Sequence, residues 1–225
     1  MRLVRGHAKT PETDRDASRR VLEWVAEHDE PAIRAWQPPR HVAFGRRDAN
    51  EPGYEAAVER AVHHNYPAVE RSVGGRAVAY TGTTVAFARY EPIESARAGI
   101  DERYEAMMRD VESALENVGV TATRGEPPNS FCPGEHSLQA AGKIVGLAQR
   151  VTADAAITSG VLVLDDHREI ATVIGDVYDA LGVPFDPDSV GSVERAGGDV
   201  ESTLPELERA LQRGESPTPL PLRQI

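Results

Sequence analysis

Four segments with the character of β-strands follow one another between residues 120 and 165, with no helical segment between them. They are VTATR, HSLQAA, KIVGLAQRV and AAITSGVLVLD. Directly before them, residues 95–118 carry apolar side chains at a period close to 3.6, which predicts a long helix. A run of strands beside long helices is typical of an α+β domain. We therefore expect a mixed, mainly antiparallel sheet that is covered by helices.

The rest of the chain supplies the other elements of such a domain. Further helices are expected over residues 16–27, 53–64, 169–181 and 204–213. Further strands are expected at AIRAWQP, HVAFG, AVERS, AVAYT and TVAFARY. Strands and helices do not alternate around a glycine-rich turn, so the pattern excludes a Rossmann fold.

The chain of 225 residues is long enough for one well-buried domain. We assign residues 1–190 to the main domain and residues 191–225 to a C-terminal helix followed by a loose tail. Thr203 and Glu206 have the spacing of a capping box for that helix. The tail is rich in Pro and Ser, which favours weak order at a chain end.

Charge excludes one class of partner and suggests a salt-rich setting. The chain carries 25 Lys and Arg residues against 36 Asp and Glu residues, a net charge of −11. Nucleic acids are not expected as partners, because phosphates need a basic surface. Acidic residues with almost no lysine are typical of halophilic proteins. The N-terminus is polar and no apolar run reaches the length of a membrane span, so we expect a cytoplasmic protein without membrane contact.

Cys132 is the only cysteine, and it lies in the segment PPNSFCPGEHS. Its prolines and glycine predict a loop, and loops are where functional groups often lie. A single cysteine excludes an internal disulfide and a zinc site built from paired CxxC motifs, and no metal is expected. The thiol is therefore either an inert packing group or a reactive nucleophile.

Lys143 follows Gly142 at the start of a predicted strand and is one of only two lysines. If the loop folds back, its ammonium could face the Cys132 thiol and favour the thiolate. An ordinary surface lysine is the alternative, although arginine fills almost every other basic position of this chain. His136, four residues after Cys132, is a second candidate partner as a general base.

Three stretches together resemble the lipoate/biotin protein ligase and acyltransferase superfamily. They are ERSVGGRAVAYTG at 70–82, GKIVGLAQR at 142–150 and TSGVLVLD at 158–165. The CPG sequence at Cys132, followed by Gly142 and Lys143, is most similar to the cysteine-dependent octanoyl-[glycine cleavage H protein]:protein octanoyltransferases. The resemblance implies the fold of a biotin/lipoate protein ligase catalytic domain over the main domain.

The resemblance also implies roles for individual residues. Cys132 would be the nucleophile that carries an octanoyl or lipoyl group as a thioester, and Lys143 would stand against the acyl carbonyl or the thiol. The residues implied in substrate binding are Arg71, Ser72, Gly74, Gly75, Ala77, Gly142 and Gly146. Candidates for the apolar wall around the acyl chain are Val73, Val78 and Phe87. Acceptors would be lipoyl domains of 2-oxoacid dehydrogenase E2 or the glycine cleavage H protein, and no cofactor would be needed.

Two other functions stay open at this point. The first is an ATP-dependent lipoate-protein ligase, which would use ATP and Mg to form a lipoyl-adenylate; some chains of this type work with a separately encoded accessory subunit. In that case Lys143 would hold the adenylate and Cys132 would be incidental. The second is a non-catalytic lipoyl-binding or scaffold domain, because Arg76, Tyr80 and Thr81 depart from the ligase pattern.

The acidic surface leads to a prediction about salt. Two acidic proteins repel one another in dilute buffer, and about 1 M salt shortens the Debye length to about 3 Å. We expect acyl transfer to an acidic lipoyl domain to be faster at about 1 M salt than in dilute buffer. Initial rates measured across a salt series check this, and maximal activity in dilute buffer would contradict it.

Overall fold

Two β-sheets organise the chain in the computed structural model, which describes residues 1–6, 8–71 and 75–225. The strands of the larger sheet are β1 Arg2–Arg5, β2 Ala32–Trp36, β6 Val85–Pro92, β7 Thr123–Arg124, β8 Ser137–Gln139, β9 Lys143–Val151, β10 Ala155–Leu162 and β11 Thr218–Pro221. They lie in the order β11-β1-β2-β6-β10-β9-β8-β7. All pairs from β2 to β7 are antiparallel, and only β11, β1 and β2 run parallel. The α+β class and the mainly antiparallel sheet are confirmed.

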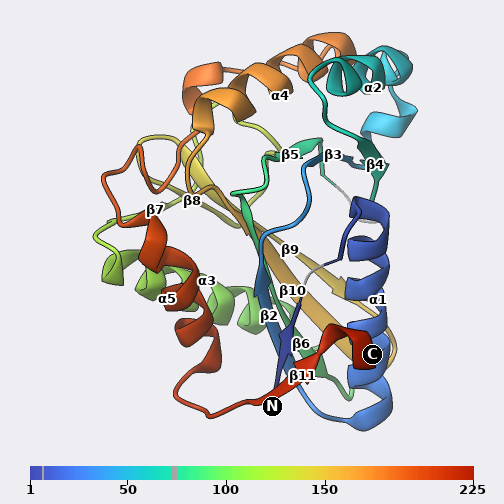
Figure 1. Cartoon of the computed structure of the whole chain (residues 1–225), viewed down its shortest axis with the longest axis vertical. Helices are drawn as coiled ribbons and strands as arrows, with labels where there is room; N and C mark the ends of the chain where they lie inside the picture. The colour runs from blue at the N-terminus through green and yellow to red at the C-terminus, as the bar shows by residue number, and fades with distance from the viewer. Residues whose placement is uncertain (7, 72–74) are drawn as a thin grey trace.

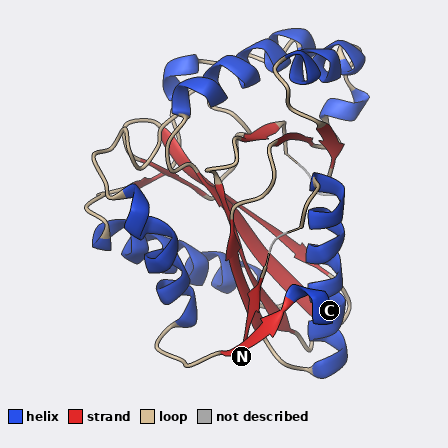
Figure 2. Ribbon diagram, in the orientation of Figure 1, coloured by secondary structure: helices blue, strands red, loops and turns tan. Residues whose placement is uncertain are grey.

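Helices cover both faces of this sheet. They are α1 Pro11–His28 on one face, and α3 Ile100–Asn117 and α5 Val200–Gln212 on the other. Figure 2 shows the strands crossing the molecule between these two layers. Val21 and Val25 of α1 pack against the β6 residues Ala88 and Tyr90. The helices on the opposite face bury Met107, Val111, Leu115, Leu207 and Leu211.

A smaller sheet forms the other end of the molecule. Its strands are β3 His41–Phe44, β4 Ala68–Glu70 and β5 Val78–Tyr80, in the order β4-β3-β5. The helices α2 Tyr54–His63 and α4 His167–Leu181 pack on one another above this sheet (Figure 1). Short 3-10 helices lie at Asp48–Asn50, Pro187–Ser189 and Leu222–Gln224. No helix within the described residues is long and apolar enough to cross a membrane.

Two helices begin earlier than predicted, because each has an N-terminal cap that the sequence pattern did not indicate. The Thr10 hydroxyl accepts a hydrogen bond from the Thr13 amide, so α1 begins at Pro11 and not at residue 16. Asp199 caps α5 in the same way, and the predicted capping box of Thr203 and Glu206 is therefore wrong. The Thr203 hydroxyl instead donates to the Asp199 carbonyl, one turn back in the chain.

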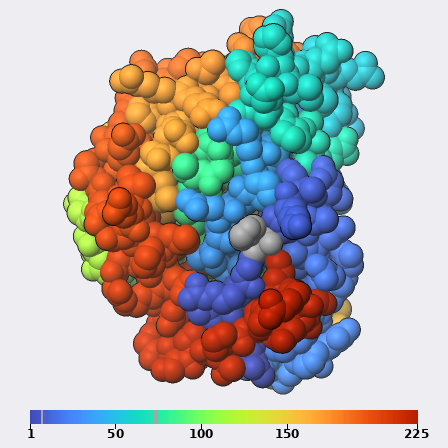
Figure 3. Space-filling model, in the orientation of Figure 1, coloured from blue at the N-terminus to red at the C-terminus, as the bar shows by residue number. Residues whose placement is uncertain are grey.

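The expected loose tail at 214–225 is also wrong, because this segment supplies β11. This strand pairs with β1, which the sequence pattern did not predict, and the prolines at 219 and 221 are tolerated at a sheet edge. Leu220 and Leu222 are buried. Figure 3 shows the C-terminal segment packed against the N-terminal segment. The domain division at residue 190 stays a prediction.

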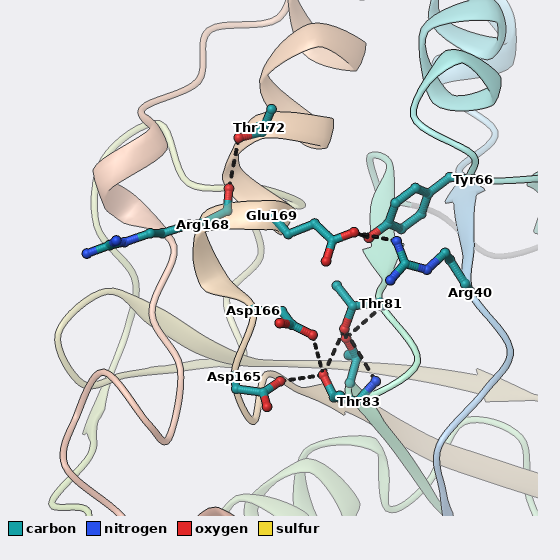
Figure 4. A network of polar contacts seen from close by, with 10 residues as sticks. Arg40, Tyr66, Thr81, Thr83, Asp165, Asp166, Arg168, Glu169 and Thr172 are labelled. Atoms are coloured by element: carbon teal, nitrogen blue, oxygen red, sulfur yellow. Dashed lines mark hydrogen bonds and ion pairs between the residues drawn. The ribbon is translucent and has the colours of Figure 1, made fainter.

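A polar network joins the two sheets at the point where β10 leads into α4 (Figure 4). The Thr83 hydroxyl lies within hydrogen-bond distance of both the Asp165 and Asp166 carboxylates. Next to this network, the Glu169 carboxylate accepts hydrogen bonds from the Arg40 guanidinium and the Tyr66 hydroxyl. Burial, together with the charges of Asp166 and Glu194, raises the pKa of Asp165 above its ordinary value of 3.8. The ionised form of Asp165 therefore lowers the stability of the fold.

This shift predicts how Asp165→Asn behaves with pH. A carboxylate whose pKa is raised on folding stabilises the fold below its unfolded pKa, and that stabilisation is lost as the pH rises through the folded pKa. We therefore expect Asp165→Asn to raise the melting temperature at neutral pH by about 2 °C, and this gain to vanish below about pH 3.5. Thermal unfolding at both pH values checks this. Asp154→Asn, at an exposed turn, is the control and should change little; a lower melting temperature of Asp165→Asn at neutral pH would contradict the prediction.

Candidate active site

A cavity of about 750 Å³ opens between α1, the smaller sheet and the strands β9 and β10. This volume is in the range of cavities that bind small molecules, roughly 300 to 1,000 Å³. Its walls are largely apolar and include Trp36, Val78, Ala86, Phe87, Phe131 and Val161. Val78 and Phe87 are thus placed as the apolar wall requires, whereas Val73 lies outside the described residues.

Cys132 lines this cavity from the loop at 125–136, which connects β7 to β8. Its backbone has φ 41°, in the left-handed region that is uncommon for residues other than glycine. Tyr178 of α4 stabilises this conformation, because its hydroxyl accepts a 2.7 Å hydrogen bond from the Cys132 amide. That hydroxyl in turn donates to the Ala77 carbonyl at 3.1 Å. The half-buried thiol thereby has a fixed position at the cavity wall.

Arg71 is the cation that contacts the thiol. Its Nη2 atom lies 3.2 Å from Cys132 Sγ and donates a 2.6 Å hydrogen bond to the Arg76 carbonyl. Burial acts to lower the pKa of Arg71, but the neighbouring Cys132 raises it, and the net direction is upward. Burial also raises the pKa of Tyr80 to about 12, so this phenol stays neutral. The guanidinium therefore remains charged beside the thiol.

Gly75 makes room for this contact. Its φ is +95°, which disfavours any side chain, and a Cβ atom there would lie 2.8 Å from Arg71 Nη2 and 3.0 Å from Cys132 Sγ. Glycine at this position thus keeps the space around the Cys132 sulfur open. Ser72 and Gly74, also expected to bind substrate, lie outside the described residues.

The Lys143 side chain contacts the same loop, but it binds the backbone of that loop. The side chain is 1% exposed, and its Nζ atom donates to the carbonyls of Cys132 at 2.7 Å and Phe131 at 3.1 Å. A third hydrogen bond of 2.6 Å goes to the Glu126 carboxylate. The loop does fold back as expected, yet within the described residues the ammonium meets the carbonyl of Cys132 and not its thiol.

Glu126 is a site residue that the sequence pattern did not reveal. Besides Lys143, its carboxylate accepts hydrogen bonds from the Ser137 hydroxyl at 2.8 Å and the Gly134 amide at 3.0 Å. It therefore joins both ends of the segment that carries Cys132. In the sequence Glu126 is one acidic residue among many, and only the folded loop brings it to the lysine.

Of the remaining predicted residues, one lines the cavity and two lie behind its wall. Gly146 lines the cavity beside Lys143. Gly142 lies behind it with φ +116°, where a Cβ atom would lie 2.6 Å from the backbone nitrogen of Gly191. Ala77 is buried and acts through its carbonyl, as the acceptor of the Tyr178 hydrogen bond.

His136 also lines the cavity but is engaged elsewhere. Its ring stacks on Tyr104 with the ring centroids 3.7 Å apart. Among the described residues no hydrogen bond joins it to Cys132, so the geometry does not support a Cys-His pair. The same residues contain no group of three or more His, Cys, Asp or Glu side chains suited to hold a metal ion.

The close contacts at Gly75 predict a selective loss of thiol reactivity. Gly75→Ala forces Arg71 away from Cys132, so we expect alkylation of the thiol by iodoacetamide to slow by about tenfold at neutral pH. Gly134→Ala is the matched control, because a Cβ atom there meets nothing within 4 Å. Equal alkylation rates in the two variants would show that the Arg71 contact does not matter for the thiol.

Comparisons of the sequence with known proteins find related chains. Over 120 residues the chain is 32% identical to an octanoyl-[GcvH]:protein N-octanoyltransferase of Exiguobacterium sibiricum, covering 53% of this chain and 44% of that protein. It is 29% identical over 119 residues to the protein of the same name from Geobacillus kaustophilus, covering 52% and 42%. The matches thus span less than half the length of these curated relatives.

Solved structures show the same fold. A lipoate-protein ligase A bound with ATP superposes with a TM-score of 0.74 at 19% identity, covering 97% of this chain and 88% of that one. A bi-partite lipoate protein ligase from Thermoplasma acidophilum gives a TM-score of 0.70 at 15% identity, covering 97% and 86%. The family described as the lipoyl protein ligase A/B catalytic domain matches residues 11–212. The fold and this match lead to one assignment, which confirms the resemblance seen in the sequence: the chain belongs to the lipoyl protein ligase A/B catalytic domain family.

Proposed function

We propose that the protein is a cytoplasmic acyltransferase of protein lipoylation, which moves an octanoyl or lipoyl group through a Cys132 thioester onto a lysine of a lipoyl domain. One observation carries the proposal: the sole thiol lies in the wall of a largely apolar cavity, 3.2 Å from a buried guanidinium. The names of the curated relatives support the octanoyl group and the glycine cleavage H protein as donor or acceptor.

The chemistry of transfer suits this site. The Cys132 thiolate attacks the carbonyl carbon of the donor, the new S–C bond forms, and the donor sulfur or amine leaves. The acceptor lysine then attacks the acyl-enzyme, an amide forms, and the Cys132 sulfur leaves. With a thioester donor, the exchange is close to isoenergetic and the aminolysis runs downhill. With an amide donor, the first step is uphill and formation of the new amide on the acceptor offsets it, so neither reaction needs a cofactor. The apolar cavity contributes about 0.8 kcal/mol for each methylene of the acyl chain that it buries.

The alternative, an ATP-dependent lipoate-protein ligase, fits these residues less well. In that reaction Lys143 would hold the carboxylate and phosphate of a lipoyl-adenylate. Its ammonium is instead buried and bonded to Glu126 and two backbone carbonyls. A lysine with its donors engaged in this way is poorly placed to take a phosphate. The ligase structures that superpose on this chain support the shared fold only.

Intact-protein mass spectrometry tests the proposal. The protein is incubated in high salt with an octanoylated glycine cleavage H protein, without ATP. We expect an octanoyl mass increment that hydroxylamine releases, because thioesters react with this reagent. Cys132→Ala should show no increment while keeping the wild-type melting temperature.

Two results would overturn the transferase. An increment of equal size on Cys132→Ala would place the acyl group on another residue. Absence of the increment, with modification of a lipoyl domain only when free lipoate and ATP are supplied, would establish the ligase.

A further inference from the structure

A second hollow, of about 460 Å³, lies beside α1 on a different side of this helix from the cavity that contains Cys132. Ala17 and Arg20 of α1 line the hollow, whereas Asp14 and Ser18 line the cavity. The segment after β1 and the C-terminal 3-10 helix complete the hollow. Only the first turns of α1 therefore separate it from the cavity.

The lining of this hollow is basic, and we call it the basic hollow. Among the described residues no carboxylate lines it, and four cations do: Arg5, Lys9, Arg20 and Arg223. Glu208 neutralises Arg5 through hydrogen bonds of 2.5 and 2.6 Å. The other three side chains are exposed, and they form no ion pair within the described part of the chain. Lys9 is also the only lysine besides Lys143.

This local charge is opposite to the net charge of the chain, which is −11. An acidic partner is repelled by the net charge, but it is attracted where its carboxylates come within about 10 Å of the basic hollow, the Debye length at 0.1 M salt. Complementary charge selects a partner and a contact surface more than it adds affinity. The basic hollow therefore fits an acidic protein surface. Nucleic acid does not fit, because its many phosphates would meet the acidic remainder of the molecule.

We propose that the basic hollow docks an acidic surface of the acceptor lipoyl domain while the acceptor lysine enters the cavity. This inference rests on the proposed acyl transfer and names the surface that recognises the acceptor. The three unpaired cations come from separate segments of the chain: Lys9 precedes α1, Arg20 lies on it, and Arg223 lies near the C-terminus. Such a set can contact several carboxylates spread over a protein surface.

The position of the basic hollow suits a partner that must also reach the cavity. Arg15 of α1 is exposed and lines the cavity, so the cavity reaches the protein surface at this helix. A helix with its side chains is about 10–12 Å across. A domain of about 100 residues has a radius of gyration of about 13 Å. A lipoyl domain docked on the basic hollow is therefore large enough to extend across α1 to the opening.

Two triple variants with the same net charge separate docking from general repulsion. The first reverses the three unpaired cations: Lys9→Glu, Arg20→Glu and Arg223→Glu. The control reverses three exposed arginines on α2, α3 and α4: Arg60→Glu, Arg109→Glu and Arg168→Glu. In 0.1 M salt we expect the KM for an acidic lipoyl domain to be about tenfold higher in the first variant than in the control. At about 1 M salt, where the Debye length is about 3 Å, the two values should agree. Rates of acylation by a small neutral octanoyl thioester normalise both variants, because this reaction involves no acceptor.

Equal KM values of the two variants in 0.1 M salt, or a difference that persists at about 1 M salt, would overturn the inference. Competition of inorganic phosphate with the acceptor at constant ionic strength, lost in the first variant, would also overturn it, because the basic hollow would then bind a small anion. If the triple variant does not fold, Lys9→Glu and Arg223→Glu replace it singly, each with an expected increase of about twofold. A wild-type protein that forms no octanoyl thioester would refute the proposed function. Calorimetric titration of both variants with the lipoyl domain would still test the docking.

Discussion

The ion pair between Lys143 and Glu126 is the interaction on which the site depends. It joins the first residue of β9 to the loop that precedes β8, at a distance of 2.6 Å and with the lysine almost completely buried. A buried ammonium is stable only when its hydrogen bonds are satisfied. The carbonyls of Phe131 and Cys132 provide the two remaining acceptors. The requirement to solvate this charge thus fixes the backbone on both sides of the thiol.

The loop is held from the opposite direction by the smaller sheet and its helices. Tyr178 of α4 accepts from the Cys132 amide and donates to Ala77, just before β5. Burial raises the pKa of Tyr178 well above its ordinary value, so the phenol keeps the proton it donates. Cys132 therefore has its amide bonded to one part of the fold and its carbonyl to another. Both bonds together maintain the left-handed backbone that directs the thiol toward Arg71.

Local patterns predicted most of the elements but not the contacts between distant segments. β9 was predicted to the residue and α4 to within two, because apolar periodicity is a local signal. The pairing of β1 with β11 joins opposite ends of the chain, so no local pattern announces it. The site divides in the same way. Cys132 and Lys143 were predicted as site residues from their rarity, the loop composition and the family resemblance, whereas Glu126 is an ordinary acid until the loop closes.

The same reasoning explains why lysine is kept at position 143 in a chain that uses arginine almost everywhere else. The buried pocket offers three acceptors to one nitrogen, which matches an ammonium. Arginine there would bring five donors and a larger planar group, and the surplus donors would be buried without partners. The two cations around Cys132 are thus not interchangeable, because Lys143 binds the backbone carbonyl of Cys132 and Arg71 contacts its sulfur.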